Sequence, residues 1–283
     1  METVTLNNGV KMPKLGFGVF QVPDAKEAER VVSDALEVGY RSVDTAASYG
    51  NEEAVGAAIR HSGIPREELF ITTKLWVQDH GYENTLKAFD TSLKKLGLDY
   101  LDLYLIHKPY GDYYGAWRAM ERLYKEGRIR AIGVTSFWNE RLADLLNMNE
   151  VKPAVNQIET NVWNQKWAEA AFMQEQGVQQ EAWAPFAEGN NHVFQHPVLK
   201  KLAATYGKTT GQIMLRWLLQ RNIVAIPKST HRERMEENLN VFDFTLTEDD
   251  MAAIKALDTS KSTIYDEMDP KMALAIGKIK IHE

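Results

Sequence analysis

Polar side chains of the types that transfer protons end several short apolar runs in this sequence. Asp44 ends the run RSVD, Lys74 ends LFITTK and His107 ends LYLIH. Tyr49 follows a few residues after Asp44. If these runs are parallel strands of one sheet, their carboxyl ends lie together and the four side chains converge. The set holds neither a cysteine nor a pair of histidines, so it suits proton transfer better than metal binding.

The chemistry that these residues favour is protonation of a carbonyl oxygen by a tyrosine, whose ordinary pKa is about 10. An ammonium about 4 Å away stabilises a phenolate by roughly 4 kcal/mol, or about 3 pKa units before the effect of burial is subtracted. Lys74 is the candidate ammonium, and Asp44 is the counter-ion that keeps a buried lysine charged. His107 would orient or polarise the carbonyl. Taken singly, a lysine or histidine at a strand end is more often a surface group, so the hypothesis depends on the whole set.

The apolar runs alternate with segments of helical spacing for most of the chain. One such segment, residues 28–36, places its apolar side chains on one face, and Thr209 and Gln212 have the spacing of a helix capping box. Parallel strands separated by helices, eight in about 250 residues, favour a closed (β/α)8 barrel over an open doubly wound sheet. The predicted strands are residues 14–18, 40–45, 69–74, 101–107, 129–136, 153–159, 178–184 and 223–229.

The two ends of the chain are expected to lie outside the barrel. VTL, the Asn8-Gly9 turn and VKM predict an N-terminal β-hairpin cap, because Asn-Gly readily takes the positive φ angles of a two-residue turn. Residues from Thr259 onward follow the last predicted helix and are expected to fold as a tail over the active-site face. The long segment PFAEGNNHVFQHP after the seventh run predicts a functional loop. Since no linker interrupts the chain, residues 1–283 are expected to form a single domain.

Composition excludes several classes of protein. The chain has 283 residues, of which 44% are hydrophobic and 25% charged, which is typical of a globular protein. A net charge of −6 argues against nucleic acid or an anionic membrane as partner, so we expect a small-molecule ligand. The protein is also expected to be a monomer. The lack of cysteines and of a signal-peptide pattern favours a cytoplasmic location. The seven histidines form no zinc-binding motif, so no metal is expected.

Four motifs together resemble those of the aldo-keto reductases, which are NAD(P)H-dependent carbonyl reductases built on a (β/α)8 barrel. The motifs are VDTAASYGNEEAVGAAI, ITTKLW, DYLDLYLIH and IPKSTHRERMEEN, in the family's order. The resemblance covers essentially the whole chain and is strongest to short bacterial-type members that reduce diketogluconate or methylglyoxal. It implies that Tyr49 is the general acid, that Lys74 and Asp44 tune it, and that His107 orients the substrate.

The same resemblance implies an NADPH site held by the loops of the barrel. The implied contacts are, for the nicotinamide, Thr135, Ser136, Gln157 and Trp183; for the pyrophosphate, Pro185, Phe186 and Glu188; for the 2′-phosphate, Lys228, Ser229, Thr230 and Arg234; and for the adenine, Glu237 and Asn238. Two cations and two hydroxyls beside a helix start suit a phosphate. Taken alone, Arg234 could equally pair with Glu237 along the helix, and Trp183 could be a core residue.

The sequence departs from the family pattern around the expected substrate pocket. Lys108 stands where the family commonly has tryptophan, so it either meets an acidic substrate or extends its ammonium to solvent. Thr135-Ser136 replaces the usual Ser-Asn pair, which removes an amide and is expected to weaken cofactor binding. The stretch ETNVWNQ also differs, in loop shape only. The expected pocket wall is largely aromatic and predicts broad specificity; it comprises Phe20, Trp76, His107, Lys108 and Tyr110.

The resulting prediction is an NADP-dependent oxidoreductase that reduces aldehydes or ketones, such as α-ketoaldehydes and keto-sugars, to alcohols by hydride transfer. One alternative is a non-catalytic NADPH-binding regulatory subunit on the same barrel, in which Tyr49→Phe would change no rate. Another is a lyase or isomerase in which Lys74 forms a Schiff base without any need for NADPH.

Overall fold

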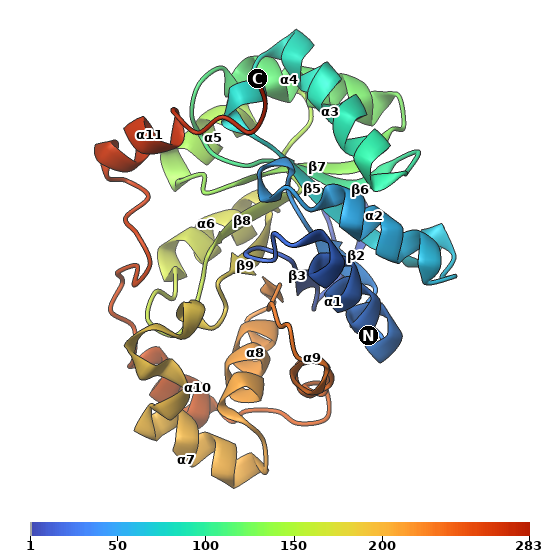
Figure 1. Ribbon diagram of the computed structural model, residues 1–283. Coiled ribbons are helices and arrows are strands. Elements are labelled where there is room, and N and C mark those ends of the chain that lie inside the picture. Colours follow the sequence, from blue (N-terminus) through green and yellow to red (C-terminus); the bar gives the residue numbers. More distant parts are fainter. Residues whose placement is uncertain (1) are drawn as a thin grey trace.

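The eight apolar runs form the eight parallel strands of one closed sheet in the computed structural model, which describes residues 2–283 (Figure 1). The strands pair in chain order, and the two edges meet where Leu15 forms a parallel bridge with Ala225. The predicted (β/α)8 barrel is therefore confirmed. The strands are β3 (Phe17–Gly18), β4 (Ser42–Asp44), β5 (Phe70–Leu75), β6 (Leu101–Ile106), β7 (Ile129–Thr135), β8 (Val155–Glu159), β9 (Gln179–Trp183) and β10 (Val224–Ala225).

Helices connect the strands and cover the outside of the barrel (Figure 1). Thr209 and Gln212 form the predicted capping box, in which each side chain bonds the other residue's backbone N–H. The helices are α1 (Ala25–Val38), α2 (Glu52–His61), α3 (Tyr82–Leu96), α4 (Tyr113–Lys125), α5 (Asn139–Met148), α6 (Trp167–Gln176), α7 (Pro197–Tyr206), α8 (Thr210–Gln220), α9 (Arg232–Leu239), α10 (Glu248–Lys255) and α11 (Pro270–Ile276).

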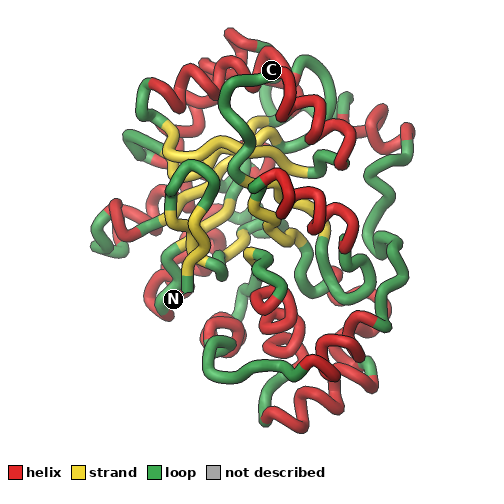
Figure 2. Tube along the Cα trace, turned by 180° about the vertical axis from the view of Figure 1, so that it is seen from behind, coloured by secondary structure: helices red, strands yellow, loops and turns green. Residues whose placement is uncertain are grey.

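The N-terminal hairpin closes the amino end of the barrel. Its strands β1 (Thr3–Thr5) and β2 (Lys11–Pro13) pair antiparallel, as predicted. The Asn7 and Asn8 side chains each donate a hydrogen bond of 2.9 Å to a backbone carbonyl near the start of β8 and β7 respectively. Figure 2 shows the hairpin lying across the strands. With this end closed, a ligand can enter only at the carboxyl ends of the strands.

The tail after α10 lies against the carboxyl end of the barrel, as predicted. The Trp76 indole donates to the carbonyl of Ile279 at 2.9 Å, and the Asn190 amide donates to that of Thr263 at 2.9 Å. In Figure 1 the red tail runs along one side of the molecule from α10 to α11. Asn190 belongs to the long loop after β9, which forms irregular turns over residues Ala187–Gln195. Over residues 2–283, no helix is long and apolar enough to cross a bilayer.

Candidate active site

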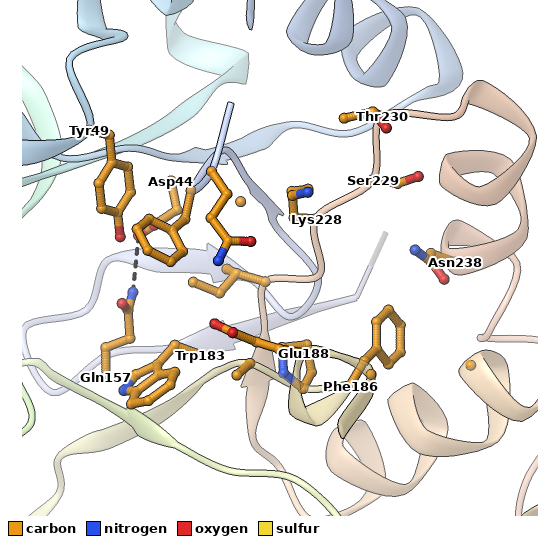
Figure 3. A pocket seen from close by; sticks show the side chains of 18 of the residues that line it. Asp44, Tyr49, Gln157, Trp183, Phe186, Glu188, Lys228, Ser229, Thr230 and Asn238 are labelled. Carbon is orange, nitrogen blue, oxygen red and sulfur yellow. Dashed lines mark hydrogen bonds between the residues drawn. The ribbon is translucent and has the colours of Figure 1, made fainter. Parts of the chain in front are cut away.

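A cavity of about 980 Å³ opens at the carboxyl ends of the strands (Figure 3). Most of the side chains that the sequence singles out line it. They are Phe20, Asp44, Tyr49, Trp76, His107, Lys108, Thr135, Gln157, Trp183, Pro185, Phe186, Glu188, Lys228, Ser229, Thr230, Arg234, Glu237 and Asn238. Three predicted residues, Lys74, Ser136 and Tyr110, do not contribute to the cavity surface.

The strand register brings the predicted proton-transfer residues together. Asp44 is the last residue of β4, Lys74 lies near the end of β5, and His107 directly follows β6. Because these strands are adjacent and parallel, their ends point to one face. Tyr49 ends a short 3-10 turn after β4, and Gly50 then adopts a left-handed φ of 70°. The turn directs the chain back over the barrel, so the Tyr49 ring reaches the end of β4.

Lys74 is fully buried, and its ammonium donates hydrogen bonds to three acceptors. Its Nζ donates to the Asp44 carboxylate, to the carbonyl of Thr45 at 3.0 Å and to the Tyr49 hydroxyl at 3.4 Å. Burial acts to lower the pKa of Lys74, but the charges of Asp44, Tyr49 and Glu181 and the hydrogen bond to Asp44 together raise it above its usual value. A lysine held as an ammonium is a poor nucleophile, which argues against the Schiff-base alternative.

Tyr49 holds its proton in this arrangement. Burial raises the pKa of Tyr49, while the charge of Lys74 and its hydrogen bond act to lower it and Asp44 acts to raise it. The net shift is upward. The sequence prediction that Lys74 acts to lower the Tyr49 pKa agrees with the direction of the lysine's effect, and burial, which that prediction left to be subtracted, outweighs it. Tyr49 is a neutral phenol, which is the form that a general acid requires.

His107 is a neutral imidazole at the edge of the Tyr49 ring. Burial lowers the pKa of His107 well below its usual value, and the charges of Lys74 and Lys108 lower it further. Its Nδ1 lies 3.2 Å from the Ser48 hydroxyl. When Nδ1 accepts that hydroxyl hydrogen, Nε2 carries the ring proton and can donate it to a substrate oxygen. Sequence reasoning missed Ser48, although it directly precedes Tyr49 in the motif AASYG.

A second buried carboxyl group, Glu181, lies beside Asp44 and was also missed. The Gln157 amide nitrogen donates to Asp44 Oδ2 at 3.0 Å and to Glu181 Oε2 at 2.8 Å, so one amide bridges both groups. Figure 3 shows the Gln157 bond to Asp44. Glu181 lies two residues before Trp183 on β9, and strand alternation places both on the same face. That alternation is the signal that could have found it.

Glu181 makes the stability of the protein depend on pH. Burial and the neighbouring Asp44 raise the pKa of Glu181 from 4.5 to about 8. Between these pH values the folded protein keeps a proton that the unfolded chain releases, so the free energy of unfolding falls as the pH rises. We expect Glu181→Gln to gain stability over the wild type by up to about 1.4 kcal/mol per pH unit across this window. Urea unfolding at pH 5, 6, 7 and 8 measures the difference in the free energy of unfolding between the variant and the wild type. Exposed Glu175→Gln is the control, and parallel stability curves for Glu181→Gln and wild type would contradict the prediction.

The far end of the cavity carries two cations without an ion-paired partner among residues 2–283. Lys228 and Arg234 are exposed, and neither side chain makes a hydrogen bond or ion pair with residues 2–283. Glu237 instead accepts from the Thr209 hydroxyl at 2.6 Å, so the alternative Arg234–Glu237 pair does not form. The cations flank the N-terminus of α9, where an anion is favoured. These residues fit a phosphate.

Figure 3 shows how the two ends of the cavity differ. Asp44, Tyr49 and Gln157 lie at one side, with the Trp183 ring next to them, and Lys228, Ser229, Thr230 and Asn238 lie at the other. Trp183 lines the cavity rather than the core. An elongated cavity with a flat aromatic surface at one end and free cations at the other fits a phosphorylated dinucleotide. In the described part of the chain, residues 2–283, no group of histidine and carboxylate side chains is placed to hold a metal ion.

The C-terminal tail changes the expected pocket wall. The Tyr110 hydroxyl donates to the carbonyl of Glu267 at 3.3 Å, and Tyr110 lies against the tail instead of lining the cavity as expected. Tail residues Tyr265, Met272, Ile276 and Ile279 line it instead. Lys108 is only 8% exposed, so the expectation that its ammonium extends to solvent is wrong. The reason is an ion pair with Glu267 in the tail.

Comparisons with known proteins agree with this geometry. A sequence model of the Aldo/keto reductase family matches residues 14–259. The chain is 54% identical over 258 residues to an uncharacterised oxidoreductase of Bacillus subtilis, covering 89% of this chain and 91% of that protein. It is 49% identical over 257 residues to a glyoxal reductase of the same organism, covering 90% and 92%. A Bombyx mori aldo-keto reductase solved in complex with NADP has a TM-score of 0.88 and 35% identity, with 95% of each chain covered. The chain therefore belongs to the aldo/keto reductase family.

Proposed function

We propose that this oxidoreductase reduces small aldehydes and ketones to alcohols with NADPH, and that Tyr49 is the general acid. The observation that carries the proposal is that the Tyr49 hydroxyl lies 3.4 Å from the Lys74 ammonium and that its ring lies beside the His107 ring in one cavity. The similarity to a glyoxal reductase supports dicarbonyl compounds as substrates. The partly aromatic cavity supports a range of carbonyl compounds rather than one.

The protein's own residues would act on the carbonyl oxygen. Bound NADPH would supply a hydride to the carbonyl carbon. The Tyr49 hydroxyl and His107 Nε2 would both donate hydrogen bonds to the oxygen, and Tyr49 would transfer its proton as negative charge develops there. The Lys74 ammonium would stabilise the resulting phenolate. This attraction is stronger in the transition state, where negative charge develops on Tyr49, than in the ground state. Asp44 keeps Lys74 charged and in position.

The residues that would hold NADPH follow from the two ends of the cavity. The Trp183 ring would pack on the nicotinamide, and the amide oxygen of Gln157 would accept from the carboxamide because the nitrogen is already bound to carboxyl groups. Thr135 donates its hydroxyl hydrogen to the carbonyl of His107, so its oxygen can act only as an acceptor for the same carboxamide. Lys228, Thr230 and Arg234 would hold the 2′-phosphate.

A continuous absorbance assay at 340 nm tests the proposal. We expect the purified protein to oxidise NADPH in the presence of glyoxal, methylglyoxal and aromatic aldehydes, and to do so faster than it oxidises NADH. Quenching of tryptophan fluorescence by NADPH measures cofactor binding separately. Binding of NADPH without turnover of any carbonyl compound would reject the proposal and favour a regulatory subunit.

Arg234 is predicted to set the preference for NADPH over NADH. Its guanidinium is unpaired, so a phosphate would gain a charge-assisted hydrogen bond, and Arg234→Ala is expected to raise the Kd for NADPH by about 10- to 100-fold. The Kd for NADH, which has no 2′-phosphate, should change far less. Arg232→Ala on the same helix is the matched control, because Glu37 already neutralises Arg232 at 2.6 Å. Equal losses for NADPH and NADH in Arg234→Ala would contradict the assignment.

A further inference from the structure

Lys108 forms a buried ion pair in the wall of the cavity. Its Nζ lies 2.8 Å from Glu267 Oε1, 2.7 Å from the Tyr265 hydroxyl and 3.0 Å from Ser136 Oγ. The side chains of Lys108 and Glu267 are only 10% and 9% exposed. An ammonium out of water needs an anion beside it, and here a carboxylate of the tail provides one.

Lys108, Ser136 and Tyr265 surround one carboxylate oxygen of Glu267. Lys108 and the Ser136 hydroxyl both donate to Oε1, and the Tyr265 hydroxyl lies 3.4 Å from it. One cation and two hydroxyls that converge on a single carboxylate oxygen form a site built for a carboxylate. Ser136 is 2% exposed, so the site is set into the protein rather than on its surface.

This carboxylate site adjoins the reacting groups. Lys108 directly follows His107 and lines the same cavity. Its Nζ lies 5.8 Å from the centre of the Trp183 ring, and the Tyr265 ring stacks on Trp183 at 5.9 Å. The positive charge of Lys108 acts on both Tyr49 and His107, lowering the pKa of each. A carbonyl compound held at Tyr49 and His107 would therefore lie in the same cavity as the Lys108 ammonium.

Glu267, the residue that occupies the site, lies in a tail segment with exposed side chains on either side of it in the chain or nearby. Met268 next to Glu267 is 61% exposed, and Leu274 in α11 is 68% exposed. If another carboxylate replaced Glu267, Lys108 would stay paired, so the exchange avoids leaving a buried ammonium alone. A neutral molecule cannot make that exchange. The arrangement therefore discriminates between acidic and neutral ligands.

We propose that Lys108, Ser136 and Tyr265 form a carboxylate subsite of the substrate cavity, with Glu267 as its internal occupant in the absence of substrate. Carbonyl compounds that carry a carboxylate, the oxo acids, displace Glu267 and are preferred over their neutral esters. This inference rests on the proposed carbonyl reduction.

Matched pairs of acid and ester test the subsite. The probes are 4-formylbenzoate and succinic semialdehyde, each beside its methyl ester, with NADPH at saturation. The measured quantity is the ratio of kcat/KM for the acid to that for the ester. We expect Glu267→Gln, which frees Lys108, to raise this ratio by at least about tenfold, and Lys108→Met to lower it by at least about tenfold.

Lys108→Met leaves Glu267 buried without a partner, so the double variant Lys108→Met/Glu267→Gln guards against misfolding. It contains no unpaired charge and is expected to keep the low ratio. The exposed pair Lys125–Glu150, 2.6 Å apart, offers controls with the same changes of charge, Lys125→Met and Glu150→Gln. These are expected to keep the wild-type ratio.

The outcomes separate this inference from the proposed function. If the esters are reduced but the acid-to-ester ratio is the same in wild type, Lys108→Met and Glu267→Gln, the subsite is rejected while carbonyl reduction stands. If Glu267→Gln speeds acid and ester equally, the ion pair only holds the tail, and the subsite is again rejected. If the wild type reduces neither the acids, nor the esters, nor other neutral aldehydes, the proposed function itself fails.

Discussion

Tyr49→Phe is expected to lower kcat for NADPH-dependent aldehyde reduction by about 1000-fold, while the Kd for NADPH stays close to that of the wild type. The phenylalanine ring keeps the packing of Tyr49 against Phe20, whose ring centre lies 5.0 Å away, but it has no proton to give. No neighbour can replace it. Burial lowers the pKa of His107 so far that the ring stays neutral, and Lys74 is held by Asp44.

Single-turnover decay of absorbance at 340 nm measures the chemical step of this variant, and quenching of tryptophan fluorescence measures cofactor binding. Tyr110→Phe is the matched control, because it removes the same hydroxyl from a tyrosine that bonds the tail and does not line the cavity. A loss of less than tenfold in Tyr49→Phe would mean that another group protonates the oxygen. It would remove the central residue of the proposed mechanism.

Lys74→Met is expected to reduce both stability and activity, for two separable reasons. The substitution leaves the Asp44 carboxylate, 2% exposed, without its cation, which is expected to lower the free energy of unfolding by about 3–5 kcal/mol. It also removes the charge that would stabilise the Tyr49 phenolate, so kcat is expected to fall by about 100-fold or more. Urea unfolding and single-turnover kinetics measure the two effects.

The double variant Lys74→Met/Asp44→Asn distinguishes these reasons. Without the buried carboxylate no charge is left unpaired, so much of the lost stability should return, whereas activity should not. If activity returned together with stability, Lys74 would act only by holding the structure. That result would contradict its assigned role beside Tyr49.

The barrel and the convergence of its candidate catalytic side chains could be predicted because they follow from local patterns. Each strand is a short apolar run, and parallel strands necessarily present their ends on one face. Asp44, Lys74 and His107 each stand at or just after such an end. The hairpin could be predicted for the same kind of reason, since the Asn8-Gly9 turn determines it locally.

The contacts that the sequence did not reveal are between residues far apart in the chain. The path of the loops and the register of the strands bring these residues together. Ser48 and His107 are 59 positions apart, and Lys108 and Glu267 are 159 apart. No period of 2 or 3.6 residues encodes such a pairing. The tail in particular has no amphipathic repeat that indicates where it lies, so Glu267 beside Lys108 was not foreseen.

The sequence by itself determined the eight strands, the types of side chain at their ends and the prediction that Lys74 is the partner of Tyr49. The tertiary structure alone decided how strongly each group is buried and which charges surround it. That is why the Tyr49 pKa is raised although Lys74 acts to lower it, and why Lys108 is paired inside the wall rather than solvated. Desolvation and the charges within a few ångströms depend on every segment that packs around a group, and only the folded chain brings those segments together.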